Sequence, residues 1–157
     1  MSDLPPENVQ QYPRPPRIEP VPHLVVVRLG GETIAETTGA FRVLETHHAP
    51  SYYLPPEDVR ARLDPVAGGS FCEWKGRARY FDVSAGGQRA PRAAWSYDAP
   101  SARFADLAGY LAFYAGLMEA CFVGSERVIP QDGDFYGGWV TRNLTGRIKG
   151  ARGTEHW

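Results

Sequence analysis

Pairs of glycines between short runs of β-forming residues constrain the fold of this chain more than any other sequence feature. Gly30 and Gly31 separate HLVVVRL from ETIAET, and Gly86 and Gly87 separate RARYFDVS from RAPRAAWSY. Such a pair is typical of a β-hairpin, because glycine adopts the positive φ angles of a tight turn without steric cost. The chain is therefore expected to be mainly β, with antiparallel strands and little helix.

One short helix is expected over residues 55–63. There PPEDVRARL places prolines in the first turn and acidic residues near the positive end of the helix dipole. Residues 64–70 are expected to form a loop. Residues 71–84 have a strand-like sequence throughout, and Gly76 is expected to mark a bulge or a close approach within that strand.

Residues 107–121 fit both a helix and strands. Their apolar residues recur at helical spacing, but YLAFY and ACFV are good strand sequences, and glycines interrupt the segment. We favour a helical turn near 104–109, followed by short strands that a turn separates. Further strands are expected at 41–46, 51–54 and 126–130.

The two ends of the chain differ in composition from the segment between them. Residues 1–22 are rich in proline and lack a hydrophobic period, so they are expected to form an extended arm. Residues 23–130 are expected to form the β domain. Residues 131–157 are rich in glycine and are expected to wrap over this domain or over a neighbouring subunit, so that the terminal arms would hold a homodimer. The expected anchors are Phe135, Tyr136, Trp139 and Trp157.

Composition and charge limit the classes of partner. With 157 residues, 43% of them hydrophobic, the chain is long enough for one domain with a substantial core. Its formal net charge of −1 gives no basic excess, so no nucleic-acid partner is expected. No apolar run approaches the roughly 18 residues of a membrane span, and no signal peptide is evident. We therefore expect a soluble cytoplasmic protein without membrane contact, in which Cys72 and Cys121 are free thiols.

Five phrases mix aromatic residues, single charges and small residues in a way that no common core pattern requires. They are RVLETHHAPSYYLPPEDV (42–59), CEWKGRARYFDV (72–83), AAWSYDAP (93–100), GYLAFYAG (109–116) and FYGGWVT (135–141). Together they resemble domain-of-unknown-function family 427, also labelled nucleotidyltransferase domain 9, from about Pro13 to Trp157. The resemblance implies a β-tent or Mss4-like fold, in which two antiparallel sheets are set at an angle around a cleft. The family label implies nucleotidyl transfer, but the motifs themselves carry no proven chemistry.

No metal or cofactor is expected. Many β-tent proteins hold a structural zinc ion through two Cys-x-x-Cys knuckles, and this chain has none. Cys72 and Cys121 each stand alone, and the adjacent His47 and His48 would point to opposite faces of a strand. A fold stabilised by an aromatic core is expected instead.

Three residues are weak candidates for catalysis. An ammonium group near a thiol favours a reactive thiolate, which pairs Cys72 with Lys75, and Glu45 is the third candidate. The alternative is that Cys72 is an ordinary core residue. Nucleotidyl transfer usually needs a Gly-Ser turn followed by paired aspartates that bind magnesium. Asp132 and Asp134 form the one such pair, and the alternative for them is a glycine-rich turn.

Seven residues of the five phrases are expected to surround one cleft and to bind a small ligand. They are Arg42, Glu45, Tyr52, Tyr53, Lys75, Trp95 and Tyr97. Aromatic walls with one carboxylate and one or two cations are typical of a small-ligand pocket, in which Lys75 or Arg42 would hold a carboxylate or phosphate. The alternative is structural: Glu45 would form a buried ion pair with Arg42 or Lys75, capped by tyrosine hydroxyls.

Three functions follow from these alternatives. The first is a binding module whose aromatic cleft holds a small molecule. The second is an interaction protein that associates with itself through its proline-rich arm and its glycine-aromatic tail. The third is an enzyme of the nucleotidyltransferase type, which the family label implies.

Overall fold

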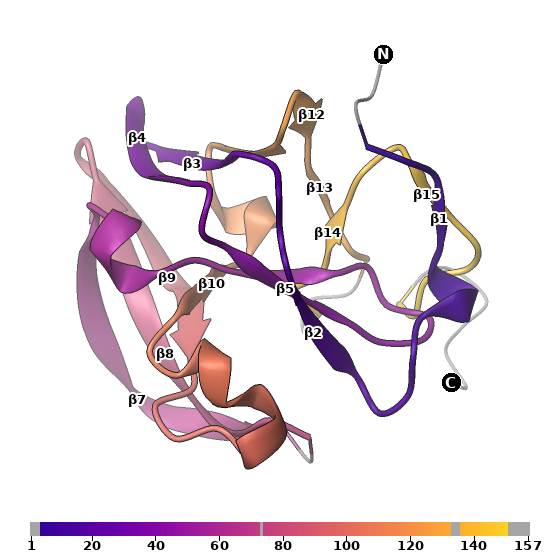
Figure 1. Cartoon of the computed structure of the whole chain (residues 1–157). Coiled ribbons are helices and arrows are strands. Elements are labelled where there is room, and N and C mark those ends of the chain that lie inside the picture. The colour runs from indigo at the N-terminus through magenta and orange to yellow at the C-terminus, as the bar shows by residue number, and fades with distance from the viewer. Residues whose placement is uncertain (1–3, 73, 133–135, 151–157) are drawn as a thin grey trace.

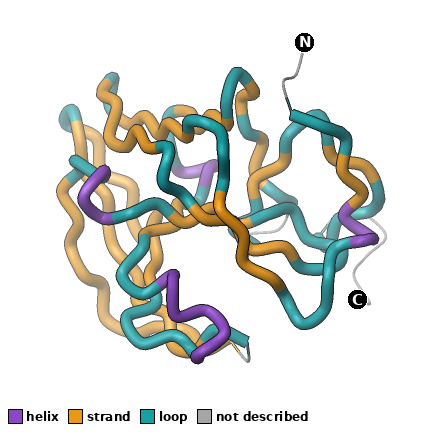
Figure 2. Tube along the Cα trace, viewed as in Figure 1, coloured by secondary structure: helices purple, strands orange, loops and turns teal. Residues whose placement is uncertain are grey.

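A computed structural model describes residues 4–72, 74–132 and 136–150 of the chain. The fold is mainly β, as the sequence predicts. It contains two four-stranded antiparallel sheets, one three-stranded sheet and two short pairs of strands (Figures 1 and 2). Within these residues, helix is limited to four short 3-10 segments.

The first sheet consists of two long hairpin strands and two further strands beside them. Its members are β7 (Arg62–Cys72), β8 (Gly76–Ala85), β9 (Gln88–Ser96) and β10 (Leu111–Phe113), in the order β10-β9-β8-β7. The predicted turn at Gly86 and Gly87 joins β8 to β9, and both glycines have positive φ. The pairing of β8 with β9 shifts register between Phe81 and Val83, opposite Arg92.

The second sheet meets the first at their glycine turns. Its strands are β3 (Val25–Leu29), β4 (Glu32–Thr37), β11 (Ala120–Val123) and β12 (Glu126–Arg127), in the order β12-β11-β3-β4. A Cβ on Gly30 would overlap the carbonyl oxygen of Ala85, and a Cβ on Gly86 would overlap the carbonyl oxygen of Gly30. Glycine at both positions therefore allows the two predicted turns to touch.

The remaining strands bring the two ends of the chain together. The three-stranded sheet has the order β2-β5-β6, with β2 at Arg17–Pro20, β5 at Phe41–Leu44 and β6 at Ser51–Tyr53. β13 (Ile129–Pro130) pairs with β14 (Trp139–Val140), and β1 (Glu7–Asn8) pairs in parallel with β15 (Leu144–Thr145). The N-terminal and C-terminal segments therefore lie side by side within one chain (Figure 1).

The helical segments settle the ambiguity over residues 107–121. They are η1 (Val9–Gln11), η2 (Pro56–Asp58), η3 (Ala102–Leu107) and η4 (Ala115–Leu117). The favoured alternative is confirmed, because η3 is followed by β10, by the short turn η4 and then by β11.

The predicted helix over 55–63 and the predicted loop over 64–70 are wrong. η2 ends at Asp58, since Val59 forms a bridge to Ala35 of β4 and the chain enters β7 at Arg62. The prolines start a helical turn, but pairing with a neighbouring strand overrides local helix propensity after that turn. The residues predicted as a loop lie within β7.

The single strand predicted over 71–84 is also wrong. β7 ends at Cys72 and β8 begins at Gly76, with Trp74 and Lys75 in the turn between them. Gly76 has a φ of 111°, a conformation that residues with a Cβ rarely adopt. The glycine therefore marks a hairpin turn and not a bulge in a continuous strand.

Two large clusters of buried side chains form the core. One joins the two four-stranded sheets and includes the fully buried Val25, Val83 and Phe113. The other is dominated by aromatic residues, namely Tyr53, Tyr80, Trp95, Tyr97 and Phe104. Burying one large side chain contributes about 1.5–3 kcal/mol, so these clusters are the main source of stability. The aromatic cluster also supplies the walls of the candidate site.

None of the helical segments in the described part of the chain has the length and apolar character that a membrane crossing requires.

Candidate functional site

A cavity of about 310 Å³ opens beside the aromatic core cluster, and we call it the basic pocket. Three cationic side chains, one carboxylate and an aromatic wall contribute to its lining: Arg14, Lys75, Lys149, Glu45, Trp74, Tyr53, Trp95 and Tyr97. The cations come from three segments that are far apart in the sequence. Arg14 belongs to the N-terminal segment, Lys75 to the β7–β8 turn and Lys149 to the C-terminal segment.

The aromatic wall is held rigidly by mutual contacts. The Trp95 indole N–H donates a hydrogen bond of 3.4 Å to the Tyr53 hydroxyl, and the two rings meet edge to face at 6.2 Å. The ring of Tyr114 lies 4.7 Å from the ring of Trp95. Burial raises the pKa of both Tyr53 and Tyr97, so these phenols remain neutral and act as hydrogen-bonding groups.

Lys75 lies over the aromatic cluster. Its ammonium nitrogen is 5.9 Å from the ring centroids of both Tyr97 and Phe104, which is within cation–π range. In one continuous strand, Cys72 and Lys75 would point to opposite faces. The hairpin turn between β7 and β8 instead places both residues on the basic pocket. The three predicted catalytic candidates, Cys72, Lys75 and Glu45, thus all line one cavity.

The pKa of His48 is lowered by burial and by the positive charges around the basic pocket. The ring lines the cavity and is half-buried. Burial, which is the largest cause, and the positive charges of Lys149, Lys75 and Arg14 together lower its pKa to about 4. The imidazole is therefore neutral at physiological pH, and the three cations are close enough to the ring to act on it together.

Gln131 is a buried residue of the site that sequence reasoning missed. Its carbonyl oxygen accepts a hydrogen bond of 3.1 Å from the backbone N–H of Ala49, and its amide nitrogen donates one of 2.7 Å to the carbonyl oxygen of Lys149. The same nitrogen lies 3.4 Å from Nδ1 of His48. Gln131 thereby ties the histidine turn and the C-terminal segment to one another, and a lone glutamine in the sequence gives no signal of that role.

Two glycines of the FYGGWVT phrase allow the C-terminal segment to approach the pocket wall. A Cβ on Gly137 would overlap the ring of Trp95, and a Cβ on Gly138 would overlap the Gln131 side chain and the Ala49 carbonyl oxygen. Trp139 follows them and is buried, with its indole N–H donating to the carbonyl oxygen of Phe113 at 2.9 Å. Of the other predicted anchors, Tyr136 lies on the pocket, whereas Phe135 and Trp157 are outside the described residues.

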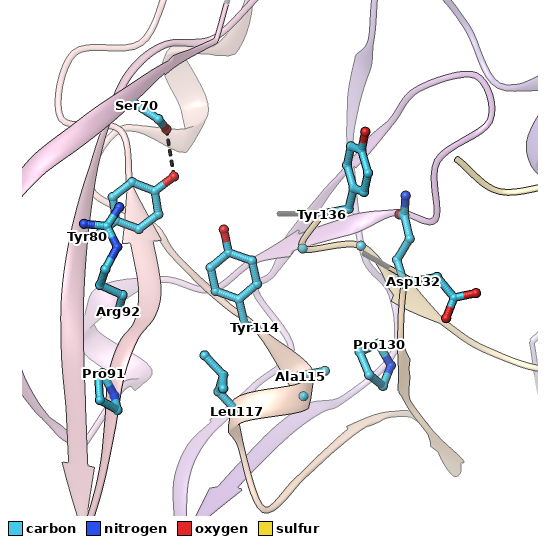
Figure 3. A pocket seen from close by; sticks show the side chains of 14 residues that line it. Ser70, Tyr80, Pro91, Arg92, Tyr114, Ala115, Leu117, Pro130, Asp132 and Tyr136 are labelled. Carbon is cyan, nitrogen blue, oxygen red and sulfur yellow. Dashed lines mark hydrogen bonds between the residues drawn. The ribbon is translucent and has the colours of Figure 1, made fainter. Parts of the chain in front are cut away.

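A second cavity, of about 730 Å³, adjoins the basic pocket, and we call it the adjoining groove. Figure 3 shows the side chains that line it. The two cavities share the lining residues Ser70, Tyr80, Tyr114, Gln131, Tyr136, Gly137 and Gly138. Arg92 and Tyr80 lie on one wall of the groove, and Asp132 and Pro130 lie on the opposite wall. Asp134, the predicted partner of Asp132 in magnesium binding, is outside the described residues.

The structure brings five of the seven predicted ligand-binding residues to the basic pocket and places two elsewhere. Glu45, Tyr53, Lys75, Trp95 and Tyr97 line it. The other two, Arg42 and Tyr52, line a separate cavity of about 160 Å³ near the N-terminal segment. They are directly paired across β5 and β6, so both side chains project from the other face of that sheet.

Arg42 binds two carboxylates of the N-terminal segment. Its guanidinium donates to Glu19 at 2.6 Å and to both carboxylate oxygens of Glu7 at 3.0 and 2.8 Å. The Tyr12 hydroxyl also donates to Glu7, at 2.5 Å. Burial opposes ionisation of Glu7, but the hydrogen bonds from Arg42 and Tyr12 outweigh it and lower the pKa of this carboxyl.

Glu45 does not form the ion pair that the structural alternative requires. Among the described residues, no salt bridge within 4.0 Å joins Glu45 to Arg42 or to Lys75. Its carboxylate instead lies on the basic pocket. His47 and His48 lie in a turn and not on a strand, and no group of three or more potential metal ligands occurs in the part of the chain that the structure covers.

Comparison with known proteins identifies the family of this chain. No curated protein matches the chain. The family model described as a domain of unknown function, DUF427, matches residues 17–124, about two thirds of the 157 residues. That match includes Glu45, Lys75 and the aromatic wall, but Arg14, Gln131 and Lys149 lie outside it. On this match, and on the motifs and the mainly β fold that accompany it, the chain belongs to the DUF427 family.

Proposed function

We propose that this protein is a binding module whose basic pocket takes the anionic group of a small molecule. One observation carries the proposal: Arg14, Lys75 and Lys149 line a single cavity, and within the described residues none of them has a carboxylate partner within 4.0 Å. Cationic side chains that outnumber the carboxylates in a cavity, and that form no ion pair there, favour an anion that replaces lost hydration with charge-assisted hydrogen bonds.

The charge balance of the basic pocket supports an anion over a cation. Three cations face one carboxylate, that of Glu45, and His48 adds no charge because its pKa is near 4. The aromatic wall excludes water on one side, which strengthens the attraction between the cations and a bound anion. Glu45 is then suited to accept a hydrogen bond from a hydroxyl or amine elsewhere on the ligand.

The enzyme alternative stays a prediction. Cys72, Lys75 and Glu45 share the pocket, which is the arrangement that such a reaction would need first. A cytoplasmic location belongs to the same proposal, because both cysteines are free thiols and such thiols persist in a reducing compartment.

Self-association is a second candidate function, and one exposed side chain favours it. Phe71 at the end of β7 is 75% exposed, which makes it the most exposed large hydrophobic side chain in the described part of the chain. The terminal segments pair with each other within one chain through β1 and β15, so a dimer through the arms would need further contacts. Light scattering of the wild type and of Phe71→Ser tests this candidate, which fails if both are monomers.

The basic pocket is tested by a thermal-shift screen against phosphate, sugar phosphates, nucleotides, carboxylates and amines. A ligand at about 100 times its Kd adds roughly 2.7 kcal/mol of stability, which raises the melting temperature by several degrees. Anions are expected to give the shift and amines are not. A screen in which every anion fails, or in which amines give the larger shift, contradicts the proposal.

Lys75→Ala separates a binding role from a structural role. This variant is expected to melt within about 0.5 kcal/mol of the wild type and to lose anion binding at least tenfold. Arg77→Ala, an exposed change two residues away, is the matched control and is expected to bind normally. A large loss of stability in Lys75→Ala without any bound anion would make the residue structural.

A further inference from the structure

We propose that the adjoining groove binds a polyhydroxylated, sugar-like group, so that the ligand of this protein is an anionic sugar. The inference rests on the proposed anion site and names the class of molecule to which the anion belongs. Three observations carry it: the lining that the two cavities share, the hydroxyl groups on that shared lining, and a strained arginine on the groove wall.

The two cavities form one site with a narrow and a wide part. They share seven lining residues, and one of these, Tyr114, has its ring 4.7 Å from the ring of Trp95 in the basic pocket. A cavity of about 310 Å³ is at the lower limit for a ligand pocket, whereas the groove of about 730 Å³ is well within the usual range. A molecule anchored by its anionic group in the basic pocket would therefore extend into the groove.

Hydroxyl groups line the place where the two cavities meet. The hydroxyls of Ser70 and Tyr80 are 2.7 Å apart and hydrogen-bonded (Figure 3). Burial and the neighbouring Tyr80 raise the pKa of Tyr114, whose hydroxyl lies on the same shared lining. Each of these groups can donate one hydrogen bond and accept others. A sugar carries hydroxyl groups, which also donate and accept, on neighbouring carbons. It can therefore form hydrogen bonds with these side chains without leaving a buried donor or acceptor unpaired.

The charges on the groove walls are balanced, unlike those in the basic pocket. Arg92 lies on one wall and Asp132 on the other, with Tyr114 between them (Figure 3). In the described part of the chain, neither side chain has an ion-pair partner. A neutral group with several hydroxyls satisfies a carboxylate acceptor and a guanidinium donor together, whereas a hydrocarbon chain would desolvate both without compensation.

Arg92 is held in a strained conformation that directs its side chain to the groove. Its φ is 48°, in the left-handed region that residues with a Cβ seldom occupy. The conformation is fixed by the β8–β9 register shift and by a hydrogen bond of 2.9 Å from the Arg92 N–H to the carboxylate of Asp82. The guanidinium carbon then lies 4.2 Å from the centroid of the Tyr80 ring. Irregular strand pairing of this kind often redirects a side chain beside a site.

The aromatic and proline surfaces of the groove suit the flat face of a sugar ring. Pro91 and Pro130 border the groove, and Tyr80, Tyr114 and Tyr136 contribute to its lining. The C–H face of a sugar packs on an aromatic ring while its hydroxyls reach polar groups at the ring edge, which matches the amphipathic character of tyrosine.

The test compares anionic sugars with anions that lack hydroxyls. Isothermal titration calorimetry on the full chain would use hexose 6-phosphates, ribose 5-phosphate, hexuronates, inorganic phosphate and phenyl phosphate. At least one anionic sugar is expected to bind tenfold or more tightly than inorganic phosphate, and phenyl phosphate is expected to lack this gain. Hexuronates against sugar phosphates distinguish a carboxylate from a phosphate as the anionic group.

Two variants assign the gain to the groove. The double variant Tyr80→Phe with Tyr114→Phe keeps both rings and removes both hydroxyls, so the ratio of its affinity for the sugar to its affinity for inorganic phosphate is expected to fall to about one. Arg92→Gly removes the guanidinium and relieves the positive φ, so it is expected to fold at least as well while the sugar advantage falls severalfold.

The outcomes separate the two proposals. Equal affinity for phosphate and for every anionic sugar overturns the sugar inference and leaves the anion site intact. Tighter binding of phenyl phosphate than of any sugar also overturns it, in favour of an aromatic ligand. If no anion binds at all, the proposed function itself fails and the inference falls with it.

Discussion

The side-chain amide of Gln131 fixes the tautomer of His48. The Ala49 N–H must donate to the amide oxygen, so the amide nitrogen, which can only donate, faces the carbonyl oxygen of Lys149 and Nδ1 of His48. Nδ1 therefore acts as an acceptor, and the single proton of the neutral ring is on Nε2. The histidine presents one donor of fixed direction and cannot gain a second proton without facing the donor of Gln131.

Acid is expected to destabilise the protein through His48. Its folded pKa of about 4 lies below the ordinary value of 6.5, so the unfolded chain binds a proton first as the pH falls. The contribution is intact above pH 6.5 and decreases as the pH falls towards 4. Since one pKa unit corresponds to about 1.4 kcal/mol, the loss between pH 7 and 4.5 should be on the order of 2 kcal/mol for this half-buried ring. Urea denaturation across this range measures it.

His48→Asn is the matched control for that titration. Its side-chain oxygen can accept from Gln131 as Nδ1 does, but it does not titrate. The variant is expected to have a flatter stability profile than the wild type between pH 7 and 4.5. Parallel profiles for the two proteins would show that His48 does not cause the acid sensitivity.

Gln131→Glu is expected to destabilise the protein by about 1–3 kcal/mol near neutral pH. A carboxylate keeps the acceptor for the Ala49 N–H but puts a second oxygen against the carbonyl oxygen of Lys149, where a donor is required. Protonation of the new carboxyl would restore a donor, so the defect should shrink at low pH. Asp132→Asn, an exposed change at the next residue, is expected to have little effect on the unfolding free energy.

Gly137→Ala is expected to cost about 1–3 kcal/mol and to change the fluorescence of Trp95. The new methyl group would overlap the indole ring, which cannot move freely because it is buried against Tyr53 and Tyr114. Gly116→Ala is the control, since its Cβ would meet only Pro130 at an ordinary 3.5 Å. Adding Trp95→Phe to Gly137→Ala should recover part of the stability, and full additivity of the two changes would contradict the overlap.

Arg42→Ala is expected to destabilise the protein by about 2–4 kcal/mol, because it leaves Glu7 and Glu19 without their shared cation. The lowered pKa of Glu7 means that its contribution is present above its ordinary value of 4.5 and is lost as the pH falls below it. The Arg42→Ala penalty should therefore shrink in acid. Arg62→Ala, which breaks an exposed pair with Asp64, should cost less than about 0.5 kcal/mol; equal penalties would show that the Arg42 network is not structural.

The glycine pairs and the aromatic phrases allowed much of the fold to be predicted from the sequence. Hairpins at Gly30–Gly31 and Gly86–Gly87 depend on local backbone geometry, which sequence reports directly. The errors over 55–70 arose because partner strands decide the structure there. Val59 and the residues of β7 become extended since β4 and β8 lie beside them, and no local pattern contains that information.

The candidate site was predictable in part for the same reason. Tyr53 and Trp95 carry aromatic bulk that a core pattern does not require, so they stood out in the sequence. Side chains alternate between the two faces of a strand, so Arg42 and Tyr52 point away from the basic pocket. The prediction grouped residues by their chemistry and did not take this alternation into account. Gln131 and Lys149 reach the pocket only because the C-terminal segment returns to it, a long-range contact that spacing cannot reveal.

The difference in exposure between the two cysteines allows occupancy of the basic pocket to be followed by thiol modification. Cys121 is buried and burial raises its pKa to about 12, so it should resist thiol reagents while the protein is folded. Cys72 is partly exposed on the basic pocket. A chromogenic disulfide should therefore modify one thiol per chain, and any compound that slows this modification without slowing that of a small free thiol has occupied the pocket. Ligand discovery can thus begin with the unmodified chain and an absorbance reading.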